Sequence, residues 1–107
     1  MIYNNILEAV GHTPMVRLNR MVEEDSAQVL VKFEAVNVGG SIKTRTALNM
    51  IEEAERKGLI KEDTIIVEPT SGNQGIGLAL VGAVKGYRTI IICLLYTSPS
   101  PRDRSVS

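Results

Sequence analysis

Two apolar, β-branched runs flank a helical segment, and this order constrains the fold more than any other feature of the sequence. Residues 64–67 and 89–93 have the length and composition of strands that are buried in a parallel sheet. The segment between them, residues 76–85, is rich in glycine and alanine, and Gly86 follows it as a natural helix end. A strand, a helix and a second strand in this order predict a βαβ unit with a right-handed crossover.

The segments that precede this unit extend the same pattern. Residues 28–34 alternate in character and predict a strand, while residues 4–10 and 15–18 predict a short helix and another strand. Beyond Gly39-Gly40-Ser41, apolar residues recur at helical spacing. The predicted inner face of this helix comprises Ala47, Leu48, Ile51 and Ala54. The order strand–helix–strand–helix–strand predicts the α/β class, with part of a doubly wound parallel sheet.

Composition excludes several classes of protein. Lysine plus arginine and aspartate plus glutamate number 12 each, and no basic stripe with interleaved aromatic residues is present, so we expect no nucleic-acid partner. No apolar run approaches the ~20 residues of a membrane helix, and the N-terminus does not resemble a signal peptide, so we expect no membrane contact and a cytoplasmic setting. The single cysteine, Cys93, is predicted to be a buried strand residue. His12 has no cysteine or second histidine near it, so no metal site is expected.

Lys43 is the first candidate for chemistry. Ser41 is a plausible helix N-cap, which would place Lys43 in the first turn of the helix. The positive end of a helix disfavours a second positive charge, and desolvation would lower the pKa of the amine further, as an imine-forming lysine requires. The alternative is a solvated lysine beside a turn.

The segment Thr70-Ser71-Gly72-Asn73-Gln74-Gly75 is the second candidate. It lies between a predicted strand and a predicted helix, where backbone N–H groups and hydroxyls form an anion site. The alternative is a capped turn with Ser71 or Asn73 as the N-cap. The glycines of this segment do not have the spacing of the dinucleotide fingerprint, and the lysine loop does not have that of a P-loop.

Three motifs in this order resemble the cysteine synthase (O-acetylserine sulfhydrylase) family of fold-type II pyridoxal-phosphate enzymes. They are the segments Gly11 to Leu18, Lys32 to Arg45 and Thr70 to Gly77, and the resemblance covers roughly residues 1–93. It implies a tryptophan synthase β-like fold, pyridoxal 5′-phosphate as cofactor, and β-replacement on O-acetyl-L-serine with sulfide to give L-cysteine and acetate. It also implies sulfide or a thiol as the second substrate, and a homodimer.

The resemblance gives roles to five residues. Lys43 is implied to be the Schiff-base lysine and the base that moves the α-proton of the substrate. Asn73 is implied to hydrogen-bond the 3′ oxygen of the cofactor. The segment implied to grip the substrate α-carboxylate comprises Thr70, Ser71, Asn73 and Gln74.

Three residues depart from the pattern that this family usually shows. Val38, Thr44 and Gln74 stand where proline, aspartate and threonine are usual, and Gln74 leaves the identity of the amino-acid substrate open. One alternative is a cystathionine β-synthase or a serine/threonine dehydratase-like lyase. The segment Lys32 to Arg45 favours the sulfhydrylase branch over the dehydratases. An alternative of another class is a non-catalytic ligand-binding module.

The same resemblance predicts how the chain is divided. We expect residues 1–45 to form the N-terminal part of a large cofactor-binding domain, and residues 46–93 to begin a small mobile domain. Residues 94–107 change abruptly to serine, proline and arginine without periodicity, so we expect a non-native or disordered tail. The phosphate cradle of the family and its partner for the pyridine nitrogen are not found in the sequence. We therefore expect a truncated enzyme that is inactive by itself.

Overall fold

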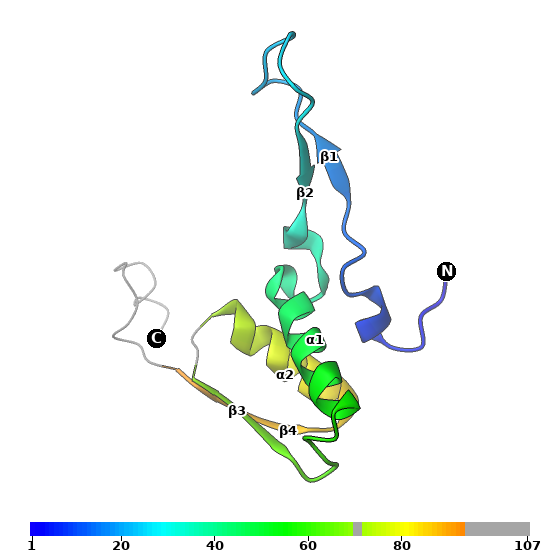
Figure 1. The fold of residues 1–107 in the computed structure, drawn as a ribbon, viewed down its shortest axis with the longest axis vertical. Helices are drawn as coiled ribbons and strands as arrows, with labels where there is room; N and C mark the ends of the chain where they lie inside the picture. The colour runs from blue at the N-terminus through cyan, green and yellow to red at the C-terminus, as the bar shows by residue number, and fades with distance from the viewer. Residues whose placement is uncertain (70–71, 94–107) are drawn as a thin grey trace.

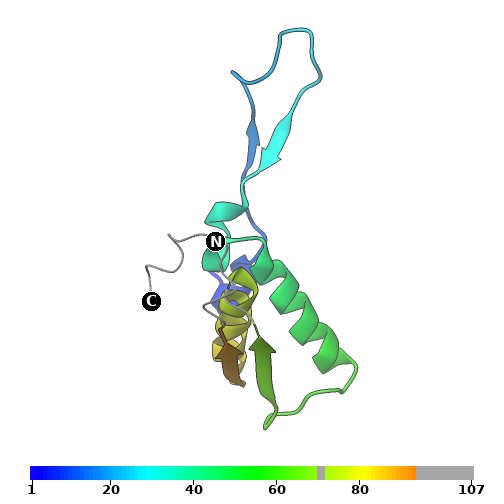
Figure 2. The same cartoon turned by 90° about the vertical axis from the view of Figure 1, so that its left-hand side faces the viewer.

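The computed structural model describes residues 1–69 and 72–93 (Figure 1). The helices and β3–β4 form one body, and the β1–β2 hairpin extends away from it (Figures 1 and 2). In chain order the elements are η1 (Ile6–Ala9), β1 (Met15–Arg17), β2 (Leu30–Lys32), η2 (Glu34–Val36), η3 (Val38–Gly40), α1 (Lys43–Arg56), β3 (Ile65–Pro69), α2 (Asn73–Lys85) and β4 (Arg88–Ile92). None of the helices in the described ranges is long and apolar enough to cross a membrane.

The two C-terminal strands form the predicted parallel pair. β3 and β4 are in register from Ile65 opposite Arg88 to Pro69 opposite Ile92, and α2 connects them. α2 packs on one face of this pair, and α1 packs on α2 (Figure 1). The α/β class and the parallel pairing predicted from the apolar runs are thus confirmed.

The opposite face of the β3–β4 pair corrects the prediction of fully buried strands. Its apolar side chains are 42–53% exposed; they are Ile65, Val67, Ile90 and Ile92. Cys93 is also exposed and lies one residue beyond β4, so the prediction of a buried strand cysteine was wrong. An apolar strand is expected to be covered on both faces. In the described residues only α2 packs on the β3–β4 pair, and it covers one face.

The N-terminal strands pair with each other instead of joining β3. β1 and β2 are antiparallel, with Met15 opposite Lys32 and Arg17 opposite Leu30. The prediction had counted residues 28–34 as the first strand of the parallel sheet. Parallel neighbouring strands need a crossover connection, which is usually a helix. The chain between β1 and β2 contains no helix, so it turns back directly and the two strands pair antiparallel.

The core lies between η1, α1 and α2. It comprises Leu7, Ala47, Ile51, Leu78 and Val81. The predicted inner face of the first helix is confirmed for Ala47 and Ile51, which are 0% and 7% exposed. Burying such aliphatic side chains stabilises a fold by about 1.5–3 kcal/mol each for the larger ones.

Two glycines of α2 permit close packing at opposite ends of the helix. A Cβ at Gly77 would lie 3.1 Å from Ala47 Cβ, Lys43 O and Thr44 Cα, so α1 and α2 touch through their backbones there. A Cβ at Gly82 would overlap the Thr89 hydroxyl, so α2 rests closely on β4. These contacts explain why a helix tolerates glycines that each cost about 1 kcal/mol relative to alanine.

The helices α1 and α2 run in the same direction. Near their starts Gly77 meets Lys43 and Thr44, and near their ends Lys85 Nζ donates to Glu55 Oε1 at 2.9 Å. The Tyr87 hydroxyl also donates to Glu55 Oε2 at 2.5 Å. Both bonds favour the charged carboxylate and hold the pKa of Glu55 below its ordinary value, with Lys85 the larger cause. Because β3 leads into α2, the carboxyl end of β3 lies at the edge where both helices begin.

Candidate functional site

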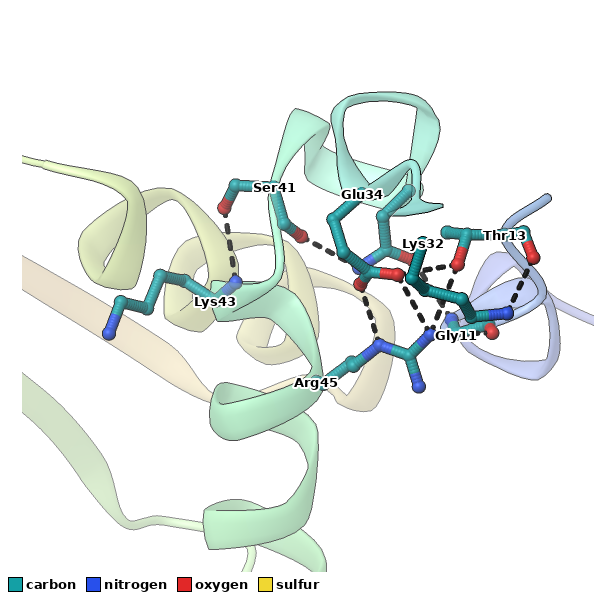
Figure 3. A network of polar contacts seen from close by, with 8 residues as sticks. Gly11, Thr13, Lys32, Glu34, Ser41, Lys43 and Arg45 are labelled. Atoms are coloured by element: carbon teal, nitrogen blue, oxygen red, sulfur yellow. Dashed lines mark hydrogen bonds and ion pairs between the residues drawn. The ribbon is translucent and has the colours of Figure 1, made fainter. Parts of the chain in front are cut away.

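Lys43 is the first residue of α1, as predicted for the first turn of this helix. Its backbone N–H donates to Ser41 Oγ at 3.1 Å, so the Ser41 hydroxyl satisfies one of the otherwise unpaired N–H groups at the helix start. Ile42, rather than the predicted Ser41, occupies the N-cap position itself. The Lys43 side chain is exposed and extends away from the polar network around Arg45 (Figure 3). Within residues 1–69 and 72–93, its amine has no hydrogen bond or ion pair.

The loop that leads into Lys43 is held by one buried amide. Asn37 is 5% exposed, and its Oδ1 accepts from the Gly11 N–H at 2.8 Å while its Nδ2 donates to Ser41 O at 2.7 Å. Between Asn37 and Ser41 the chain passes through Gly39 and Gly40, both with φ near +80° (82° and 83°), a conformation that costs other residues energy. The loop is therefore built from glycines and fixed by Asn37 at both sides.

A charged network lies on the other side of α1 (Figure 3). Arg45 donates to both carboxylate oxygens of Glu34, from Nε at 2.7 Å and from a terminal nitrogen at 3.0 Å. The same guanidinium donates to Gly11 O at 2.7 Å, and the Thr13 hydroxyl donates to Glu34 at 2.5 Å. Lys32 Nζ donates to Thr13 O at 2.6 Å. The network ties β2 and the start of α1 to residues 11–13.

The Arg45 guanidinium sets the charge state of Glu34. Its hydrogen bonds are the largest cause that lowers the pKa of Glu34 from 4.5 to about 2, and the Thr13 hydroxyl is the second. The same pairing raises the pKa of Arg45. A bidentate pair with an extra hydroxyl donor is the arrangement expected to hold a carboxylate ionised.

Replacing Glu34 with glutamine is expected to lower the Tm at neutral pH, because an amide cannot pair with the Arg45 charge. The lowered pKa means that the Glu34 carboxylate contributes its stability above pH 4.5 and loses it as the pH falls through about 2. The Tm difference between Glu34→Gln and the unchanged protein should therefore be complete at neutral pH and shrink across that window, as measured by circular dichroism. Glu62→Gln, at an exposed position outside the network, is the control. A difference that stays constant down to pH 2 would contradict the assignment.

The second predicted segment lies partly in the first turn of α2. Asn73 is the first residue of this helix and is exposed, while Gln74 is half-buried and approaches Met50 Sδ at 3.6 Å. The prediction had begun this helix at Ile76, and the structure begins it three residues earlier, with Gly72 at the N-cap position. Thr70 and Ser71 lie outside the described residues.

The structure brings the two predicted segments together. Gly77, one turn after Asn73, contacts the backbone of Lys43 and Thr44, so the first turns of α1 and α2 are neighbours. Each helix start carries unpaired N–H groups and the positive end of a helix dipole. The exposed Lys43 side chain starts from this junction, and an amine together with helix starts suits a ligand that carries an aldehyde and anionic groups. In residues 1–69 and 72–93, no group of three or more His, Cys, Asp or Glu side chains could hold a metal ion.

Sequence patterns did not predict several contacts of this region. The pair Glu34–Arg45 joins side chains eleven positions apart on different elements, and Gly11 N to Asn37 spans 26 positions. No local spacing rule relates such positions, so only the fold reveals them. A buried hydroxyl, Thr44 Oγ1, has no hydrogen-bond partner in the described part of the chain. Thr44 is one of the predicted departures from the family pattern.

The family model for pyridoxal-phosphate dependent enzymes matches residues 6–105. The chain belongs to this family. The matched range covers most of the chain and includes part of the segment predicted to be a non-native tail. The matched range includes Lys43, and the cofactor after which this family is named carries an aldehyde.

The chain is similar in sequence to particular members of the pyridoxal-phosphate dependent enzymes. The chain is 54% identical over 92 residues to a cysteine synthase of Flavobacterium sp., covering 86% of this chain and 30% of that enzyme. It is also 54% identical over 93 residues to cystathionine beta-synthase of Rattus norvegicus, covering 85% of this chain and 17% of the relative. The chain thus spans less than a third of the curated relatives that it matches.

A solved structure of the family has the same fold over the matched part. It is the crystal structure of the O-ureido-L-serine-bound K43A mutant of O-ureido-L-serine synthase, with a TM-score of 0.78 and 48% sequence identity. The match covers 87% of this chain and 29% of that one. The likeness confirms the fold-type II assignment for this partial chain.

Proposed function

We propose that the complete protein catalyses pyridoxal 5′-phosphate-dependent β-replacement on O-acetyl-L-serine, with sulfide as the second substrate and L-cysteine and acetate as products. The exposed Lys43 at the start of α1, whose backbone contacts α2 at Gly77, is the observation that carries this proposal. The similarity to a cysteine synthase supports it.

Lys43 is proposed to hold the cofactor and to move the proton. Its Nζ would bind the cofactor aldehyde covalently, and the bound cofactor supplies a ring that accepts electrons from the substrate Cα. With the substrate bound, Lys43 Nζ would take the α-proton as a general base, and acetate would leave from Cβ. After sulfide had added to Cβ, the same amine would return the proton to Cα.

The first turn of α2 is proposed to orient cofactor and substrate. Asn73, exposed at the start of this helix, would donate to the 3′ oxygen of the cofactor. The substrate α-carboxylate would be bound by Thr70, Ser71, Asn73 and Gln74. Backbone N–H groups at a helix start suit a carboxylate because they are unpaired and lie at the positive end of the dipole.

The domain division and the assembly belong to the same proposal. Residues 1–45 would be part of a large cofactor-binding domain and residues 46–93 would begin a small mobile domain, whose movement would close the site over the substrate. The complete protein would be a homodimer, as the resemblance implies.

Cystathionine synthesis is the second candidate, because the identity to cystathionine beta-synthase is as high as that to cysteine synthase. The complete protein should be assayed with O-acetyl-L-serine or L-serine as donor, and with sulfide, homocysteine or water as acceptor. Cysteine formation from O-acetyl-L-serine and sulfide, at least ten times faster than the other combinations, is expected. Faster cystathionine formation from homocysteine would favour the second candidate. No cofactor-dependent product in any combination would favour a non-catalytic ligand-binding module.

A further inference from the structure

The amide of Asn37 bridges two parts of the chain that meet beside the lysine. Its Oδ1 accepts from Gly11 N, and its Nδ2 donates to Ser41 O. The backbone of Asn37 is fixed as well, because its N–H donates to Glu34 O at 3.0 Å and its O accepts from Gly40 N at 2.8 Å. This side chain is 5% exposed and both ends of its amide are paired, so its orientation has little freedom.

The segment that this amide holds is intrinsically flexible. Gly39 and Gly40 both have positive φ, and glycine loses more conformational entropy on ordering than any other residue. A glycine pair therefore does not fix the direction in which the chain continues. The hydrogen bond from Asn37 Nδ2 to Ser41 O fixes the position of the backbone directly after the glycines.

Ser41 passes this constraint to the lysine. Its hydroxyl accepts from the backbone N–H of Lys43 at 3.1 Å, while its carbonyl accepts from Asn37. Gly11 is itself held, because its carbonyl accepts from Arg45 at 2.7 Å. A continuous set of hydrogen bonds thus runs from Gly11 through Asn37 and Ser41 to the start of α1.

We infer that Asn37 is a positioning residue for Lys43, which acts by ordering the loop of residues 38–42 through Ser41. The inference rests on the proposed function, in which the Lys43 amine must meet the cofactor aldehyde in one geometry. A small misplacement of a reacting group lowers its rate strongly, by as much as ~100-fold per 1 Å in the most demanding cases. The donor Nδ2 is the part of Asn37 on which this role depends.

Asn37→Asp in the complete protein tests the inference, because aspartate has the same shape and keeps the acceptor for Gly11 N but turns an oxygen toward Ser41 O. Hydrogen exchange of the cofactor-free protein should rise about tenfold in residues 38–43, as expected for the loss of one buried hydrogen bond and an unfavourable oxygen pair, and stay unchanged in residues 46–56. The rate of covalent pyridoxal phosphate attachment to Lys43, followed by absorbance and borohydride reduction, should fall about tenfold. The pH midpoint of that absorbance should shift.

Tyr87→Phe is the matched control, since it removes one hydrogen bond at the other end of α1. Hydrogen exchange in residues 38–43, the attachment rate and its pH midpoint should all match those of the unchanged protein in this control. If Asn37→Asp does not fold, Ser41→Ala, which removes only the hydroxyl that accepts from Lys43 N, should slow attachment about threefold.

Two results would overturn the positioning role alone: attachment and its pH midpoint as in the unchanged protein, or equal slowing in Tyr87→Phe. A different result, no attachment to Lys43 in the unchanged protein, would overturn the proposed function and this role with it.

Discussion

Replacing Lys43 with alanine in the complete protein is expected to abolish covalent attachment of pyridoxal phosphate and to lower kcat/KM for cysteine formation at least ~1,000-fold, a loss of at least ~4 kcal/mol of transition-state stabilisation. The effect is large because one amine would both hold the cofactor and move the α-proton, so its removal affects two steps. Borohydride reduction followed by peptide mapping measures the attachment, and a product assay measures the rate. The fold should be unaffected, since the side chain is exposed.

Lys57→Ala provides the comparison for this experiment. Lys57 follows α1 directly and is exposed, so its replacement removes one positive charge at the end of this helix without touching the proposed site. Attachment and rate should equal those of the unchanged protein. Reduced cofactor that maps to another lysine in the Lys43→Ala variant would show that Lys43 is not the attachment residue.

Gly77→Val is expected to destabilise the protein by about 1–3 kcal/mol and to lower activity further than the loss of stability explains. Even the Cβ of the new side chain would lie 3.1 Å from Lys43 O and Thr44 Cα, and backbone atoms cannot yield as a flexible side chain can. The first turns of α1 and α2 must separate to admit the methyl groups. Lys43 then moves away from Asn73, and misplacement of a reacting group is costly. Denaturant unfolding and kcat measured well below the Tm separate the two effects.

Ala79→Val puts the same β-branched side chain at an exposed position of the same helix and serves as the control. It should cost only the difference in helix propensity, below ~0.7 kcal/mol, and leave kcat unchanged. Equal losses in the two variants would mean that the contact between the helix starts has no special role.

The sequence was most informative where apolar pattern and local turn chemistry agree. The runs that became β3 and β4 predicted a parallel pair, and Gly86 marked a helix end that the structure confirms with φ of 88°. The apolar runs and the glycine helix end each depend on a few neighbouring residues, so they can be recognised without knowledge of the tertiary fold. The position of Lys43 in the first turn of α1 follows from the same kind of local reasoning.

The errors arose where the outcome depends on distant parts of the chain. The pairing of β2 with β1 depends on the connection between the two strands. The apolar pattern of a strand does not show which other strand it pairs with. The start of α2 was placed too late because Gly72 to Gly75 reads locally as a loop, while the structure continues the helix back to Asn73. Glu34 meets Arg45, and Asn37 meets Gly11, only after the chain has folded back.

The roles of Lys43, Asn73 and Gln74 remain predictions that rest on the resemblance. The structure adds that the helices carrying them start side by side, which the sequence could not show.

The fastening of α1 to α2 at both ends has a mechanical consequence. The close contact at Gly77 holds the starts of the two helices together. The hydrogen bonds of Glu55 with Lys85 and Tyr87 hold their C-terminal ends together, so neither helix can slide along the other. They would travel as a single lever about 20 Å long, given 1.5 Å of rise per residue. Any pivot must then lie outside this lever. The proposed boundary between residues 45 and 46 falls inside α1, so a closing movement of the small domain requires the first turn of α1 either to part from α2 or to move with it.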